Sequence, residues 1–181
     1  MAATTIERVG RLPGPAPALA GGALAAVGIA VAVAQSTVRS IEAWLSAGLG
    51  RGLGLVEAEP LRSAVVFELE GRSVGFTITP GCSVAFLVPF FFVVAAGLVA
   101  VGRIHLRRAV TAVTVVTAAL FAVNQLRLLI VTASMRGWGF EAGYERSHVL
   151  LGTLASTVGV VLAVFLFLFV VTRHRPEPDG G

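Results

Sequence analysis

The sequence predicts an all-α integral membrane protein, with about four transmembrane helices in a bundle and a small extracytoplasmic β-hairpin before the second span. Composition is the first reason. Of the 181 residues, 56% are hydrophobic and only 13% are charged, and the mean hydropathy is +0.87. A typical soluble domain has about 25% charged residues. The second reason is that several charge-free segments approach or exceed the roughly 20 residues that a helix needs to cross the bilayer.

Four spans are predicted, and together they form one membrane domain over residues 1–181. They cover residues 16–38, 83–102, 109–134 and 149–172. The third span continues past its charge-free part because the apolar stretch "LLIVTAS" follows Arg127. That arginine is therefore expected about one or two turns inside the outer end of its helix. The tail at 176–181 is expected to be disordered.

The arginines predict the orientation of the spans. They cluster in three short segments: the N-terminus with Arg8 and Arg11, the connector "RIHLRR", and the tail "RHRPEPDGG". These segments fall on one side of a four-span bundle, and short basic segments stay in the cytoplasm. We therefore expect a multi-pass plasma-membrane protein with both termini cytoplasmic. The connections at 39–72 and 136–148 would then lie outside.

The first span has a second interpretation. The sequence "AVAQ" at 32–35 has the small-x-small pattern of a signal-peptidase site and follows a basic start. The apolar run is longer than the usual signal-peptide core of about 7–15 residues, which favours a retained span. Cleavage stays open as an alternative, and it would leave the downstream topology unchanged.

A β-hairpin is predicted at about residues 64–79. Two runs alternate apolar with other residues on either side of the turn-forming "EGRS": Val65, Phe67 and Leu69, then Val74, Phe76 and Ile78. Pro80 and Gly81 end the second strand. Between the first span and the hairpin, the spacing of Ile41 and Trp44 indicates a helix that extends the span or lies along the outer interface.

Three reactive side chains are expected at one membrane depth. Cys82, the only cysteine, begins the second span, Arg127 lies near the outer end of the third, and His148 begins the fourth. Polar groups beside or inside spans are costly and are commonly functional. One cysteine cannot form an internal disulfide, a CxxC pair or a thiolate-rich zinc site. We expect no metal, no other cofactor and no nucleic-acid partner.

This set of residues is suited to acyl transfer. A thiol at a helix N-terminus beside an arginine is favoured in its nucleophilic thiolate form. Histidine can give a proton to a leaving amine and later accept one. Arginine can stabilise the thiolate, an oxyanion or a substrate carboxylate.

Three further residues are expected to support this set. Asn124 precedes Arg127 by three residues, so it shares a helix face with the guanidinium and could orient it or contact substrate. Ser83 directly follows the cysteine. Ser156 follows His148 by eight residues on a face that also carries Gly152, which favours close helix packing.

These residues resemble the exosortase/archaeosortase family of membrane transpeptidases. In that family a cysteine in a "CSG"-like context, an arginine in an "N-x-x-R" segment and a histidine at the start of a later helix form the proposed catalytic set. Here "GCSV", "NQLR" and "ERSHVLLG" supply Cys82, Arg127 and His148, and the resemblance covers about residues 63–172. Val84 stands where the family usually has glycine, and many members have about eight spans. The chain therefore resembles a compact, actinobacterial-type member.

The resemblance implies a cysteine transpeptidase or protease. It would cleave, through a thioester, the C-terminal sorting signals of exported, membrane-anchored precursors at the outer membrane face. Such a signal consists of a short motif, a hydrophobic helix and a basic tail, so these precursors and the lipid bilayer are the expected partners. The alternative is a non-catalytic multi-spanning subunit or scaffold. In that case Cys82 is a packing residue, Arg127 extends toward head groups and His148 belongs to a loop.

Overall fold

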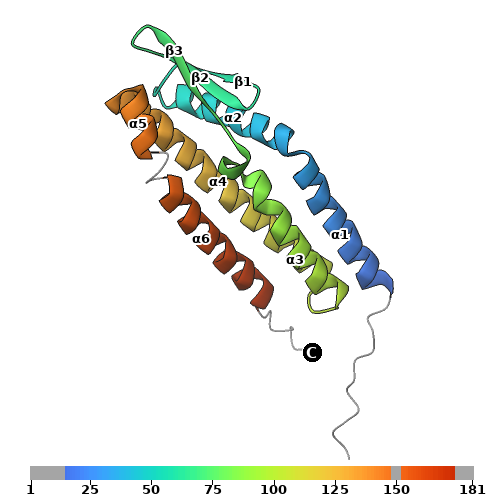
Figure 1. Cartoon of the computed structure of the whole chain (residues 1–181). Helices are drawn as coiled ribbons and strands as arrows, with labels where there is room; N and C mark the ends of the chain where they lie inside the picture. The colour runs from blue at the N-terminus through green and yellow to red at the C-terminus, as the bar shows by residue number, and fades with distance from the viewer. Residues whose placement is uncertain (1–14, 148–151, 174–181) are drawn as a thin grey trace, which may run out of the picture.

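The computed structural model describes residues 15–147 and 152–173 and is mainly helical, with one small sheet at one end (Figure 1). The helices are α1 (Pro15–Val33), α2 (Gln35–Gly52), α3 (Val88–Ala100), α4 (Leu106–Trp138), α5 (Phe140–Arg146) and α6 (Gly152–Thr172). The strands β1 (Ala58–Leu61), β2 (Ala64–Leu69) and β3 (Arg72–Thr77) form an antiparallel sheet in the order β1-β2-β3. Two short 3-10 turns, η1 (Pro80–Cys82) and η2 (Val84–Phe86), connect β3 to α3.

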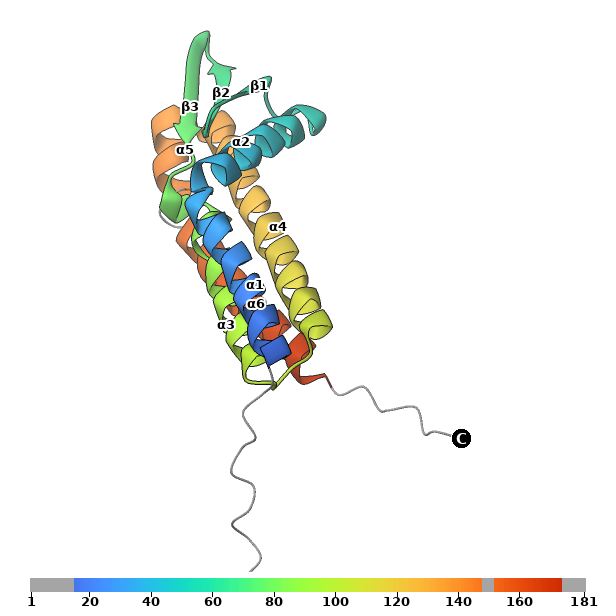
Figure 2. The same cartoon turned by 90° about the vertical axis from the view of Figure 1, so that its right-hand side faces the viewer.

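The helices α1, α3, α4 and α6 lie side by side as a bundle (Figures 1 and 2). α1 packs along α3, α6 packs along α4, and contacts between α3 and α4 join the two pairs. Glycine allows the closest approach: a Cβ added at Gly21 would lie 2.7 Å from the carbonyl oxygen of Ala96. At Gly28 it would lie 2.7 Å from Cβ of Phe92. Small residues thus bring α1 against α3, as expected for helices that associate through packing in an apolar solvent.

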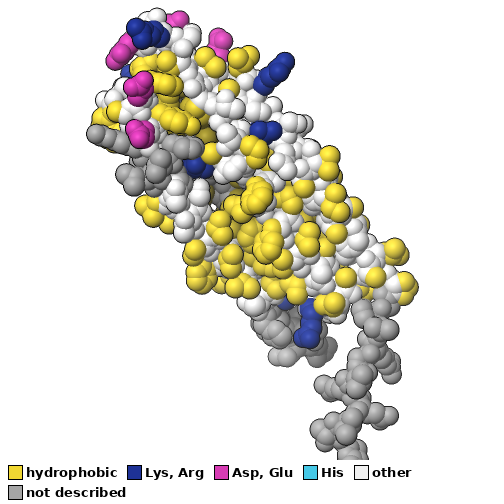
Figure 3. All heavy atoms as spheres, viewed as in Figure 1, with side chains coloured by type: hydrophobic (Ala, Val, Ile, Leu, Met, Phe, Trp, Pro, Cys, Tyr) yellow, Lys and Arg dark blue, Asp and Glu magenta, His cyan; other side chains and the backbone are white. Residues whose placement is uncertain are grey.

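Two of the described helices, α1 and α4, are long and apolar enough to cross a membrane. Two shorter apolar helical stretches cover Val84–Ala100 and Ser156–Thr172. The bundle exposes many large apolar side chains, such as Ile29 on α1 and Phe165 on α6. Figure 3 shows these side chains covering the bundle on one face, with charged side chains at its two ends. Such a surface is typical of contact with lipid, and the number of spans stays a prediction.

The first helix ends earlier than expected. The span predicted at 16–38 is divided at Ala34, where α1 stops and α2 begins, and Figure 2 shows α2 crossing the end of the bundle at an angle to α1. α2 buries its polar and small face, with Glu42 and Ala43 both 0% exposed, while Trp44 is 63% exposed. A helix with apolar residues outward is suited to a membrane interface.

The second span begins differently from the prediction. We expected a helix from Ser83, but α3 starts only at Val88, with Pro89 in its first turn. Proline lacks the N–H that a helix interior needs, so it is tolerated only at such a start. Cys82 therefore ends a 3-10 turn, two residues before the apolar helical stretch Val84–Ala100, and does not lie in the first turn of a regular α-helix.

The predicted hairpin is present as β2 and β3. Leu69 pairs with Arg72 across a two-residue turn in which Glu70 and Gly71 have φ of 54° and 74°, as a type I′ turn requires. The third strand, β1, was not predicted, because Pro60 in its middle cannot donate a ladder hydrogen bond. An edge strand tolerates proline, and β1 is at the edge.

The region after Arg127 is more helical than expected. α4 extends to Trp138, beyond the predicted end at residue 134, and α5 replaces part of the loop expected at 136–148. The chain reverses at Gly139, whose φ is 80°. α5 then packs on α4 at Gly143, where an added Cβ would lie 2.6 Å from Cα of Met135. The predicted disordered tail at 176–181 lies outside the described residues.

We predict that Gly143→Ala destabilises the protein by about 1–3 kcal/mol, because the new methyl group overlaps the backbone of α4 and cannot be relieved by a side-chain rotation. Denaturant unfolding in detergent measures the change. Gly137→Ala is the matched control: Gly137 also lies in this region, on α4, but a Cβ there meets nothing within 4 Å. Its helix should gain about 0.5–1 kcal/mol. Equal effects of the two substitutions would contradict the close α4–α5 packing.

Candidate functional site

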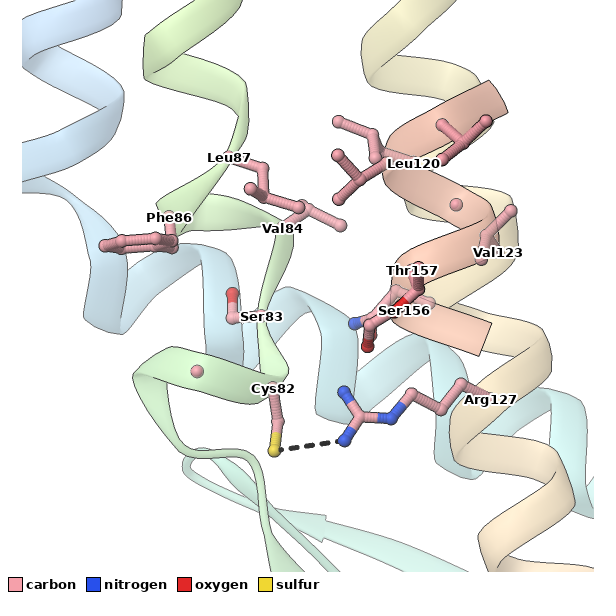
Figure 4. A pocket seen from close by; sticks show the side chains of 15 residues that line it. Cys82, Ser83, Val84, Phe86, Leu87, Leu120, Val123, Arg127, Ser156 and Thr157 are labelled. Atoms are coloured by element: carbon pink, nitrogen blue, oxygen red, sulfur yellow. Dashed lines mark hydrogen bonds between the residues drawn. The ribbon is translucent and has the colours of Figure 1, made fainter. Parts of the chain in front are cut away.

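A cavity of about 410 Å³ lies where the η1–η2 segment, α4 and α6 meet. Figure 4 shows it from close by. Its polar lining consists of Cys82, Ser83, Asn124, Arg127, Ser156 and Thr157. The structure therefore brings five predicted site residues, from three separate parts of the chain, to the wall of a single cavity.

Cys82 and Arg127 are in direct contact. Nη2 of Arg127 lies 3.5 Å from Sγ of Cys82, within hydrogen-bonding distance for sulfur (Figure 4). The thiol is free and partly buried. Arg127 lies 11 residues before the end of α4, which is about three turns inside the helix rather than one or two. A guanidinium in this position can donate to the sulfur or to an oxyanion that forms beside it.

His148, the third residue predicted to be catalytic, lies outside the described residues. The described chain reaches Ser147 after α5 and resumes at Gly152 at the start of α6. The position of the imidazole therefore stays a prediction. Ser156 is placed at the cavity, one residue before Thr157.

α6 forms one wall of the cavity by packing closely on α4. A Cβ added at Gly159 would lie 2.9 Å from Cγ1 of Val123. Further along the bundle, the rings of Phe91 on α3 and Phe167 on α6 meet with centroids 5.6 Å apart. The remaining cavity walls are largely apolar: Val84, Phe86 and Leu87 before α3, and Val160 and Val161 on α6. The cavity thus combines a polar end at the thiol with apolar sides.

The structure adds Glu42, which was not predicted as a site residue. Its side chain is 0% exposed, and its Oε1 accepts hydrogen bonds from the backbone N–H of Val84 (3.0 Å) and from Nδ2 of Asn124 (2.8 Å). Nε2 of Gln125 donates to the backbone oxygen of Glu42 at 3.4 Å. Oε2 has no hydrogen-bond partner among the described residues. Nδ2 of Asn124 therefore donates to this carboxyl group, and among the described residues the Arg127 guanidinium donates no hydrogen bond to the Asn124 amide oxygen.

The environment of Glu42 favours the protonated acid. Burial away from water raises the pKa of Glu42 above its ordinary value of 4.5, against smaller lowering effects from the Ser83 hydroxyl, the Val84 N–H, the Asn124 amide and the charge of Arg39. The folded protein therefore holds this proton more tightly than the unfolded chain does.

Little in the sequence indicated that Glu42 belongs to the site. This residue belongs to the 39–72 connection, which contains several other acids and was expected to lie on the outer side of the membrane. The helical spacing of Ile41 and Trp44 indicated a helix that extends the first span or lies along the outer interface. That spacing gave no reason to expect the opposite, polar face to be buried against the protein, as it is at Glu42.

No protein family, curated protein or solved structure matches this chain. Within the described residues, no group of three or more His, Cys, Asp or Glu side chains could hold a metal ion. The candidate site is therefore defined by the cavity, by the contact between Cys82 and Arg127, and by the buried carboxyl group of Glu42 behind them.

We predict that Glu42→Gln removes a pH dependence of stability. A raised folded-state pKa contributes stability that is complete below the ordinary value and is lost as pH rises through the raised value. The wild-type protein should therefore lose thermal stability relative to the variant as pH rises above 4.5, the ordinary pKa of the group. Thermal unfolding in detergent measures both curves, and parallel curves would contradict the raised pKa.

Proposed function

We propose that this protein is a membrane-embedded cysteine transpeptidase or protease of the exosortase/archaeosortase type. It cleaves C-terminal sorting signals of exported, membrane-anchored precursors. The observation that carries the proposal is the contact between the only thiol and the Arg127 guanidinium at the polar end of a cavity. Isolated packing cysteines have no need of a cationic partner. A nucleophile with an oxyanion-stabilising donor beside it is the arrangement that acyl transfer needs.

The proposed topology has four spans, with both termini in the cytoplasm and the site at the outer face. The side-by-side arrangement of α1, α3, α4 and α6 supports it. Arg103, Arg107 and Arg108 lie at the connection between α3 and α4, at the end of the bundle away from the sheet. Short arginine-rich connections are typical of the cytoplasmic side. The turn η2 lengthens the apolar stretch of α3 to Val84–Ala100.

The proposed reaction proceeds through a thioester. Sγ of Cys82 attacks the scissile carbonyl carbon, and a C–S bond forms while negative charge moves to the carbonyl oxygen, where Arg127 can stabilise it. The C–N bond then breaks, and the amine leaves with a proton that we assign to His148. An amine of the acceptor, or water, next attacks the thioester carbonyl and gives a proton back to His148. The C–S bond breaks, and the cysteine is regenerated.

The apolar walls of the cavity support a substrate that is itself partly embedded in lipid. The hydrophobic helix of a sorting signal would pack beside η2 and α6, whose cavity-lining residues are mostly apolar. Such packing would hold the peptide bond before the helix at the depth of the thiol. Fixing both reactants in this way is a large part of the rate enhancement that enzymes achieve.

We predict that Cys82→Ala abolishes processing of a co-expressed precursor that carries a C-terminal motif, an apolar helix and a basic tail. The nucleophile is removed, while the fold needs no thiol at a partly buried position. Immunoblotting for full-length and cleaved precursor, with the thermal unfolding of the purified variant as control, measures the effect. Continued cleavage by a folded variant would sink the assignment.

We also predict that a membrane-impermeant maleimide applied from outside labels Cys82 faster than it labels glutathione at pH 7. Arg127→Leu should slow the labelling roughly tenfold, because a nearby cation stabilises the attacking sulfur. The wild-type chain has one cysteine, so no background correction is needed. A thiol that reacts more slowly than glutathione, whatever residue stands at 127, would favour the non-catalytic alternative.

A further inference from the structure

One oxygen atom connects the two chain segments that carry the reactive pair. Oε1 of Glu42 accepts from the N–H of Val84 and from the side chain of Asn124. Val84 follows Cys82 by two residues, and Asn124 precedes Arg127 by three, about one helical turn. Because both hydrogen bonds are accepted by the same atom, the Val84 N–H and the Asn124 side chain must both lie within hydrogen-bonding distance of Oε1 and therefore close to each other.

We propose that Glu42 is the positioning residue that sets the contact between Cys82 and Arg127. The inference rests on the proposed function, in which that contact prepares the nucleophile. Among the described residues, Glu42 makes no hydrogen bond to the sulfur or to the guanidinium. It acts through the backbone of one segment and the side chain of another.

The segment around Cys82 needs such a support. Its own backbone N–H groups at the cysteine form 3-10-type bonds, from the N–H of Cys82 to the oxygen of Thr79 (2.9 Å) and from the N–H of Ser83 to the oxygen of Pro80 (3.3 Å). Short 3-10 turns are held less firmly than an α-helix. A buried N–H without a partner costs free energy, and Glu42 supplies the acceptor for Val84.

α2 holds this segment on both sides of the cysteine. Before it, Nη1 of Arg39 donates to the backbone oxygen of Ile78 at 3.5 Å, and after it, Glu42 accepts from Val84. Arg39 is also the charged residue that acts on the Glu42 carboxyl group. On the side of α4, the bond from Gln125 to the backbone oxygen of Glu42 fixes the register of the two helices.

The role depends on an acceptor and not on a negative charge. The Val84 N–H and Nδ2 of Asn124 both donate to Oε1, and a glutamine side chain presents an equivalent amide oxygen. Glu42→Gln therefore keeps the hydrogen bonds from Val84 and Asn124. Glu42→Leu has a similar size but no acceptor, so the Val84 segment and Asn124 lose their common partner.

The test measures the maleimide labelling rate of Cys82 at pH 7 in the purified full-length protein, in a double-mutant cycle with Arg127→Leu. We expect Glu42→Gln to label within about threefold of wild type. The labelling rate of Glu42→Leu should fall to about that of Arg127→Leu. The double variant should label no more slowly than either single variant, because the effects of substitutions at interacting positions are not additive. A general loss of packing would not cancel the effect of Arg127 selectively, and thermal unfolding verifies the fold of each variant.

Three results would overturn the inference: a wild-type rate in folded Glu42→Leu, additive effects of the two substitutions, or a Glu42→Gln rate as low as that of Glu42→Leu. If Glu42→Leu does not fold, Asn124→Ala removes one of the two bonds and must lower both the rate and its dependence on Arg127. The proposed function fails separately, when wild-type Cys82 labels no faster than glutathione and Arg127→Leu changes nothing. If wild-type Cys82 labels fast and Arg127→Leu slows it, but substitution of Glu42 leaves the rate unchanged, the positioning role of Glu42 is contradicted and the proposed function is not.

Discussion

The arrangement of α2, the turn after β3 and α4 depends on one buried carboxyl group, that of Glu42, which lies where these three segments meet. An apolar bundle offers a carboxyl group no water, so Glu42 must find its partners in the protein. It finds them in the turn after β3 and in α4, and thereby joins the interfacial helix α2 to both. Polar pairing of this kind is directional, unlike the packing of alanine and valine in the rest of the bundle. It therefore fixes a local geometry that apolar contacts alone would leave variable.

α4 connects two separate apolar cores. Leu120 belongs to the core of the bundle, and Leu128 belongs to the core beneath the sheet, which also contains Ile78. Between these two leucines the helix carries a polar band with Asn124 and Arg127, and the cavity lies beside this band. The site thus lies between the core of the helical bundle and the core beneath the sheet. Under the proposed function, this position would accommodate an apolar substrate helix and a polar peptide bond together.

Sequence patterns predicted the parts of the fold that obey a simple period, and failed where another constraint dominated. Alternating apolar residues predicted the hairpin of β2 and β3. β1 was not predicted because it contains Pro60, and α3 begins later than predicted, with Pro89 in its first turn. The meeting of Cys82 with Arg127 was predicted from membrane depth alone, because residues at equal depth on packed helices are brought near one another. Glu42 was missed because the spacing of the apolar residues on its helix predicted a continued span or an interfacial helix, and did not indicate that the opposite, polar face would be buried in the protein. The placement of His148 lies outside the described residues.

In the proposed orientation, the length of α4 before Arg127 sets the depth of the guanidinium in the bilayer. Leu106, at its first turn, and Arg127 are separated by 21 residues, or about 32 Å along the helix axis, which is close to the thickness of the hydrocarbon layer. In the proposed orientation the guanidinium, and the sulfur that it touches, would stand at the level where acyl chains give way to head groups. A precursor anchored by a helix of ordinary length would present its first extramembrane peptide bond at that same height. Selection among exported proteins would then begin with distance from the membrane, before any side chain of the motif is read.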